Sequence, residues 1–122
     1  MDIRIKRVYD APSPDDGTRI FVDRLWPRGI SKERLAADLW LKGVTPSTEL
    51  RTWFHKDKER FDEFRKHYLA ELAMAGSDME TLRSEAEKGR ITLLTAAKDE
   101  ERNHVVVLKD YLLAAHPKTK RS

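Results

Sequence analysis

The segment from Arg19 to Leu25 constrains the fold more than any other, because apolar side chains would lie on both faces of an extended chain there. Ile20 and Val22 would face one side of a sheet, and Phe21 and Leu25 would face the other. A strand that buries both faces is typical of the centre of a parallel sheet covered by helices. The sequence therefore predicts a central strand over 19–25, within an α/β domain.

Strand and helix patterns alternate along the rest of the chain. Three further strands are predicted over Asp2–Tyr9, Asp38–Leu41 and Ile91–Thr95. Helices are predicted after good N-cap residues, namely Ser31, Thr45, Asp57, Ser77 and Asp99. This alternation predicts a single compact α/β domain, with a mostly parallel sheet of about four strands and helices packed on it in three layers.

Apolar side chains at spacings of three and four mark the core-facing stripes of two helices. The stripes consist of Phe61, Phe64, Tyr68, Leu72 and Ala75 in one helix, and of Val105, Leu108, Leu112 and Ala115 in the last. On the first strand, we expect Ile3, Ile5 and Tyr9 to form the buried face. The following segment, 10–17, is dense in turn formers and is expected to be an exposed loop.

The length of 122 residues fits one domain, which we place at 1–116, followed by a basic, flexible tail at 117–122. The sequence contains no cysteine, which excludes disulfides, thiolate metal sites and cysteine nucleophiles. No segment has the apolar length of a signal peptide or a membrane span. We therefore expect a cytoplasmic protein with no membrane association.

Charged side chains are concentrated where the predicted strands end. Right-handed crossovers would bring the loops after Tyr9, Leu25, Leu41 and Thr95 to one edge of the sheet. Most of the unusual polar residues lie in or next to these loops, namely Arg7, Asp23, Arg24, Arg28, Lys32, Lys98 and Asp99. Guanidinium groups at a helix N-terminus are suited to a phosphate or carboxylate. The alternative is a structural salt-bridge network in which Asp23 and Asp99 are the partners.

Three further side chains could take part in such a site. Trp26 could stack on a ligand, although a core role is favoured. His104, beside Asn103, could transfer protons together with Asp23, and a packed, hydrogen-bonded histidine is the favoured alternative. No nucleophile stands out, and His55 and His67 lack a carboxylate at ligand spacing, so no metal site is predicted.

Several motifs resemble the YeaO-like proteins, a bacterial family of domains of unknown function. The motifs are Lys6-Arg7-Val8-Tyr9-Asp10, Val22-Asp23-Arg24-Leu25-Trp26-Pro27-Arg28-Gly29, Thr45-Pro46-Ser47 with Leu50, and Leu93-Leu94 through Ala97-Lys98 to Asn103-His104. The resemblance covers about 3–113 and implies a compact cytoplasmic α/β domain without an assigned activity. The chain departs from many relatives at 55–58, where they have Gly-His-Asp-Pro, and at Thr95, where an aromatic residue is common.

The leading functional hypothesis is a cleft that binds a small anion through Arg7, Arg24, Trp26, Arg28, Lys32, Lys98 and Asn103. In an enzyme, Asp23 and His104 would be the catalytic pair. No cofactor is predicted. Two alternatives remain open: a nucleic-acid binder that uses the arginine-rich rim and the basic tail, and an interaction module whose arginines are purely structural. Oligomeric state is not predicted from the sequence.

Overall fold

The computed structural model describes residues 1–120, with side chains as far as Ala114. It contains a four-stranded sheet of β1 (Ile3–Arg7), β2 (Thr18–Phe21), β3 (Leu39–Trp40) and β4 (Ile91–Thr95). The strand order is β1-β4-β2-β3, and every neighbouring pair is parallel. This confirms the predicted parallel sheet and places β4 and β2 at its centre.

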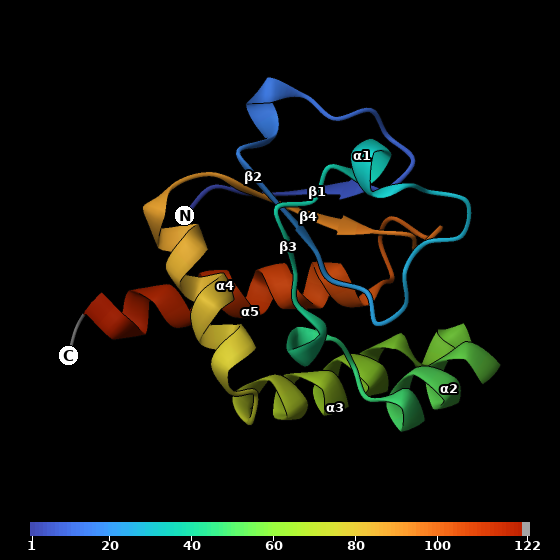
Figure 1. Ribbon diagram of the computed structural model, residues 1–122. Coiled ribbons are helices and arrows are strands. Elements are labelled where there is room, and N and C mark those ends of the chain that lie inside the picture. Colours follow the sequence, from blue (N-terminus) through green and yellow to red (C-terminus); the bar gives the residue numbers. More distant parts are fainter. Residues whose placement is uncertain (121–122) are drawn as a thin grey trace.

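Helices cover both faces of the sheet, but unequally. They are α1 (Lys32–Leu35), α2 (Thr48–Lys56), α3 (Phe61–Ala73), α4 (Ser77–Lys88) and α5 (His104–Lys120), with short 3₁₀ turns η1 (Pro14–Asp16), η2 (Lys42–Val44) and η3 (Lys58–Arg60). In Figure 1, α4 and α5 lie on one side of the sheet with α2 and α3 beyond them, and α1 lies on the other side. No helix in the described part of the chain is both long and apolar enough to cross a membrane.

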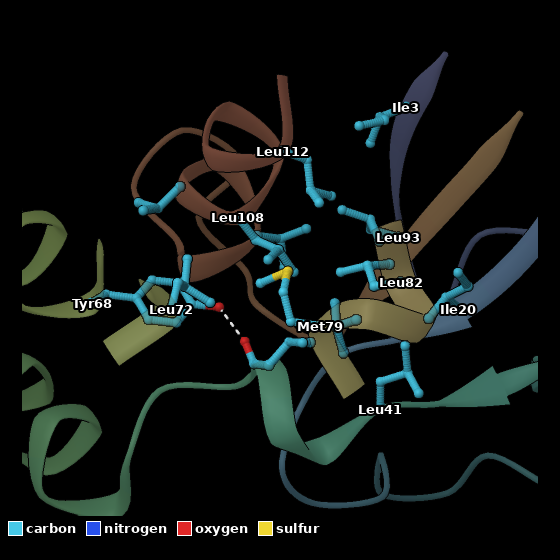
Figure 2. Close-up of a cluster of buried hydrophobic side chains, with 14 of the residues drawn as sticks. Ile3, Ile20, Leu41, Tyr68, Leu72, Met79, Leu82, Leu93, Leu108 and Leu112 are labelled. Carbon is cyan, nitrogen blue, oxygen red and sulfur yellow. Dashed lines mark hydrogen bonds between the residues drawn. The ribbon is translucent and has the colours of Figure 1, made fainter. Parts of the chain in front are cut away.

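The larger core lies between the sheet and the long helices. Figure 2 shows Ile3, Ile20 and Leu93 of the strands facing Leu82 of α4 and Leu108 of α5. Each of these side chains is buried, and burying one contributes about 1.5–3 kcal/mol relative to exposure. The predicted stripe on α3 is confirmed by its buried members, Phe64, Tyr68 and Leu72. Ala115 of the expected α5 stripe lies outside the described side chains.

A smaller cluster packs on the opposite face of the sheet. Phe21 and Leu94 point to this face and pack with Val8, Ile30 and Leu35. The helix on this side, α1, has only four residues, so this layer is formed mostly by loop segments. The two clusters explain why β2 and β4 are apolar on both faces.

The strands end earlier than the sequence predicts. The ladder of β1 ends at Arg7 and that of β2 at Phe21. Val22 still packs in the larger core with Ile20, as expected, but the alternation predicted for the later residues is not observed. Tyr9 and Leu25, expected to be buried, are 44% and 68% exposed, and Val8 is buried instead. The prediction of a strand that continues to Leu25 is therefore wrong.

Ser31 caps α1 as predicted and accepts from the Arg34 amide, whereas two of the other predicted helix caps are shifted. The Thr45 hydroxyl donates to the Lys42 carbonyl in η2, so Ser47 caps α2 instead and accepts from the Leu50 amide. Asp57 caps the short turn η3, after which α3 begins at Phe61.

The two remaining caps also differ from the sequence prediction. Ser77 is the first residue of α4, Gly76 holds the N-cap position, and the expected capping box does not form. Asp99 accepts the amides of Glu101 and Arg102 in a turn, and α5 begins only at His104. Because α5 continues to Lys120 and side chains beyond Ala114 are not described, the flexible tail at 117–122 stays a prediction.

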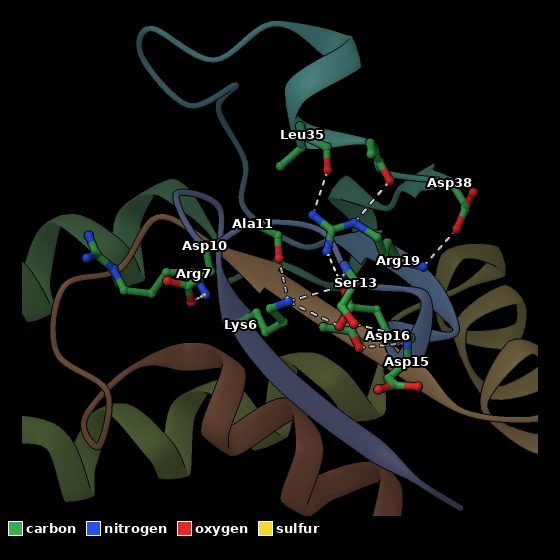
Figure 3. A network of polar contacts seen from close by, with 12 residues as sticks. Lys6, Arg7, Asp10, Ala11, Ser13, Asp15, Asp16, Arg19, Leu35 and Asp38 are labelled. Atoms are coloured by element: carbon green, nitrogen blue, oxygen red, sulfur yellow. Dashed lines mark hydrogen bonds and ion pairs between the residues drawn. The ribbon is translucent and has the colours of Figure 1, made fainter.

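The segment 10–17 is anchored by a buried ion pair, which the sequence analysis did not predict. Asp16 accepts from Arg19 Nη1, from Lys6 Nζ at 3.2 Å and from the Ser13 amide at 3.0 Å (Figure 3). Arg19 also donates to the Leu35 carbonyl at the end of α1. This network ties β1, β2, η1 and α1 together, so the segment is not a freely exposed loop.

Candidate functional site

A cleft of about 450 Å³ lies at the carboxyl ends of the strands. Its lining comes from the loops after β1, β2 and β4, from the segment before α2, and from α2 and η3. These segments gather at the right-hand side of Figure 1. The cleft thus lies at the edge of the sheet where the sequence analysis expected the polar loops to meet.

Six basic side chains line the cleft, against two carboxylates. Three of them, Arg24, Arg28 and Lys98, belong to the predicted set. The other three are Arg51, Lys58 and Arg102. Among the side chains that the structure describes, none of these six forms an ion pair with a carboxylate. The cleft therefore carries an excess of positive charge, and none of these six cations is held in an ion pair with a carboxylate of the described residues.

The basic side chains of α2 and η3 were not predicted to belong to this site. Arg51 and His55 are four residues apart and share one face of α2, and Lys58 follows in η3 after the extended residue Asp57. That spacing was the available signal, but only the packed structure shows that this face borders the cleft. Glu71 of α3 fixes the start of α2, since its carboxylate accepts from the Ser47 amide at 2.8 Å and from the Ser47 hydroxyl at 2.6 Å.

Asp23, in the lining of the cleft, connects three segments of the chain through its carboxylate. Its carboxylate accepts from the Thr95 hydroxyl at 2.6 Å and from the Ala96 amide at 2.8 Å. His104 Nε2 lies 3.1 Å from Asp23 Oδ1. Burial alone would raise the pKa of Asp23. Three interactions oppose this effect: the hydrogen bond and charge interaction with His104, the Ala96 amide and the Thr95 hydroxyl. Their net result is a pKa below the ordinary value of 3.8. Asp23 therefore stays ionised and joins the ends of β2 and β4 to α5.

His104 is oriented by two acceptors. Its Nε2 lies 2.8 Å from the Val22 carbonyl oxygen and 3.1 Å from Asp23 Oδ1. Because both neighbours accept, the neutral ring carries its proton on Nε2, which leaves Nδ1 without one. The structure thus brings together the two residues of the predicted proton-transfer pair.

Arg24 is only partly satisfied by the protein. Its Nη2 donates to the Pro46 carbonyl at 3.3 Å. Its Nε is buried and has no hydrogen-bond partner among the described residues. A buried guanidinium N–H without an acceptor costs about 1–3 kcal/mol or more, and a ligand oxygen would remove that cost.

Trp26 borders the cleft, but most of its contacts are structural. Its indole nitrogen donates to the Ile30 carbonyl at 2.6 Å. Its ring centroid lies 5.7 Å from that of Phe21 and 5.4 Å from that of Trp40. This geometry agrees with the favoured core role of a residue that also lines the cleft.

The remaining three predicted ligand residues differ in position. Arg7 lies outside the cleft lining and donates through Nε to the Ala97 carbonyl at 3.2 Å. Lys32 is exposed at the start of α1 and also lies outside the lining, because the chain turns away after Gly29. Asn103 lines the cleft, but it is buried and its Oδ1 accepts the Val106 amide as the cap of α5.

Metal ligands do not gather in the part of the chain that the structure describes. No group of three or more histidine, aspartate or glutamate side chains is placed to hold an ion there. The two carboxylates of the cleft are instead engaged with hydroxyl, amide and imidazole groups, as Asp23 is, or with backbone amides, as Asp99 is.

Comparison with known proteins identifies clear relatives. Residues 2–122 match the family DUF488-N3i, described as the inactive DUF488-N3 subclade. The chain is 51% identical over 112 residues to the uncharacterised protein YeaO of Escherichia coli (strain K12), which covers 92% of this chain and 97% of that relative. It is 43% identical over 110 residues to the uncharacterised proteins Rv3073c of Mycobacterium tuberculosis and Mb3100c of Mycobacterium bovis. Each of these alignments covers 90% of this chain and 92% of the relative. No solved structure matches the chain.

Proposed function

The chain belongs to the DUF488-N3i family, the inactive DUF488-N3 subclade, and on this premise we propose that its cleft binds a small molecule through a phosphate or carboxylate group, without chemical turnover. Three sides of the cleft would contribute cations: the loop after β2, the segment from α2 to η3, and the loop after β4. Guanidinium groups hold phosphates and carboxylates with paired N–H donors, so arginines are well suited to this role.

The observation that carries this proposal is the unpartnered Nε of Arg24 among unpaired cations. The rival hypothesis of a structural salt-bridge network needs Asp23 and Asp99 as partners of the arginines. Asp23 is instead engaged with Thr95, Ala96 and His104, and Asp99 accepts two backbone amides. The arginines of the cleft thus form no ion pair with either carboxylate, which supports the binding proposal over a structural network.

Proton transfer is a second candidate function, and the Asp23–His104 pair favours it. Asp23 would hold the ring in place while Nδ1 of His104 exchanged a proton with the bound molecule. The description of the family as inactive supports binding alone. Phosphorus NMR of a bound phosphate ester over hours separates the two, because turnover that is lost in His104→Gln would establish catalysis.

The decisive experiment is a thermal-shift screen of inorganic phosphate, sulfate, nucleotides, sugar phosphates and small carboxylates. The screen compares the wild type with Arg28→Ala and with the control Arg34→Ala. Both arginines are exposed, but only Arg28 lines the cleft. A ligand at about one hundred times its Kd adds about 2.7 kcal/mol to the free energy of unfolding, which raises Tm by several degrees.

We expect one ligand class to shift the wild type and Arg34→Ala, and to shift Arg28→Ala much less. An equal shift in both variants, or no shift with any anion, would overturn the proposal. A single-stranded oligonucleotide belongs in the same screen at two salt concentrations. Binding of the oligonucleotide alone, with an affinity that falls steeply with salt, would establish the nucleic-acid alternative instead.

A further inference from the structure

The cleft has an apolar wall as well as a basic one. Tyr9 and Leu25 both line it, and they are two of the few large hydrophobic side chains that the described chain leaves exposed, at 44% and 68%. Single exposed hydrophobic residues are common on protein surfaces, but two that border the same cleft form a site for apolar contact.

The sheet order explains how these two side chains come to flank one surface. Tyr9 follows β1 and Leu25 follows β2, and β4 lies between these strands. The chain leaving β4 carries Ala96 and Ala97, whose methyl groups also line the cleft. The small residues Ala96 and Ala97 thus lie between the large residues Tyr9 and Leu25, and together they form a shallow apolar wall against which a flat group can lie.

Arg7 gives Tyr9 a fixed place on this wall. Its guanidinium carbon lies 5.2 Å from the centroid of the Tyr9 ring, and its Nε donates to the Ala97 carbonyl. In Figure 3, the Arg7 side chain points away from the Lys6 and Asp16 network. Arg7 thus links the Tyr9 ring to Ala97 of the apolar wall instead of binding a ligand directly.

We propose that the ligand is an organic phosphate or carboxylate whose apolar ring lies against Tyr9 and Leu25 while its anionic group meets the basic side chains near Arg24. This inference rests on the proposed function and specifies the class of ligand. The cleft volume of about 450 Å³ greatly exceeds what a bare phosphate ion fills. It falls in the range of about 300–1,000 Å³ that is typical of sites for small organic ligands.

Calorimetric titration with three matched anions tests the proposal. Inorganic phosphate has no organic group, glycerol 3-phosphate adds a polar one, and phenyl phosphate adds an apolar ring. We expect phenyl phosphate to bind the wild type about tenfold more tightly than glycerol 3-phosphate, because ring burial adds apolar contact. Leu25→Ala and Tyr9→Ala should each reduce this preference several-fold, because they weaken the binding of phenyl phosphate more than that of glycerol 3-phosphate.

Leu113→Ala is the matched control, because Leu113 is also an exposed leucine and lies on α5 outside the cleft lining. It should keep the full preference for phenyl phosphate. If both phosphate esters bind with equal affinity and Arg28→Ala weakens both, the apolar wall plays no part and only the proposed function stands. If no anion binds, both proposals fail. An equal loss in Leu25→Ala and Leu113→Ala would also overturn the assignment of the wall.

Discussion

Replacing Asp16 by asparagine should strongly destabilise the fold without affecting the cleft. The substitution keeps the size of the side chain and removes its charge. Asp16 is 3% exposed and its partner Arg19 is 5% exposed, so neither group can exchange its partner for water. The Asp16 carboxylate also accepts from Lys6 Nζ and the Ser13 amide, and the variant would lose a donor–acceptor match at one or more of these contacts.

The expected cost follows from the charge that is left behind. Removing one partner of a buried ion pair typically costs about 3–5 kcal/mol, because the other charge stays buried without compensation. Arg19 keeps its hydrogen bonds to the Leu35 and Ala36 carbonyls, which favours the lower part of this range. A loss of about 3 kcal/mol corresponds to a decrease in Tm of roughly 10 °C for a domain of this size.

Urea unfolding followed by circular dichroism measures this loss directly. Asp15→Asn is the matched control, because Asp15 lies in the same turn, is exposed, and forms no ion pair among the described side chains. The control should stay within about 0.5 kcal/mol of the wild type, as is usual for surface substitutions. If Asp16→Asn were equally neutral, the buried pair would not hold the segment 10–17, and the reasoning would be refuted.

Two further predictions concern Asp23 and the glycines with positive φ, Gly17 and Gly29. The pKa of Asp23 lies below 3.8, so its ionised form stabilises the fold above this pH, and the contribution is lost as pH falls below it. The difference in free energy of unfolding between the wild type and Asp23→Asn should therefore be largest near neutral pH and shrink below about pH 3.8. A difference that is constant with pH would contradict the assignment. Gly17→Ala should lower the free energy of unfolding, measured in urea, more than Gly29→Ala does. Both glycines have positive φ, so either alanine costs about 1–2 kcal/mol in backbone conformation, but a Cβ at Gly17 would also lie 2.2 Å from the Arg90 carbonyl oxygen, while a Cβ at Gly29 meets open space. Equal losses in the two variants would show that the turn around Gly17 relaxes freely.

Patterns with a short period were enough to predict most of the fold. The run Ile91–Thr95 is wholly buried, and the stripe on α3 faces the core, since both follow from the spacing of apolar residues. The location of the cleft also followed from the sequence, because parallel strands place their carboxyl ends at one edge. These features depend on local sequence and on general rules of connection.

Features that depend on tertiary contacts could not be predicted in the same way. The strand β2 ends at Phe21, followed only by a hydrogen bond from the Val22 amide to the Leu94 carbonyl of β4, and no local signal near Leu25 marks that point. The cations of α2 reach the cleft only because α2 packs beside the strand ends. Asp16 and Arg19 are three residues apart, a spacing that does not reveal that both are buried.

The two arginines on either side of Phe21 show how structural and binding roles can be separated by physical criteria. Arg19 directs Nη1 to Asp16, Nε to the Ala36 carbonyl and Nη2 to the Leu35 carbonyl, so each of its nitrogens has an acceptor within the protein. Arg24 has one bond of 3.3 Å and a buried Nε without an acceptor. A ligand oxygen would gain little at Arg19 and would remove an existing penalty at Arg24. Of these two arginines, Arg24 is therefore the one whose hydrogen bonds the fold leaves incomplete, and it lies at the carboxyl edge of the sheet, in the lining of the cleft.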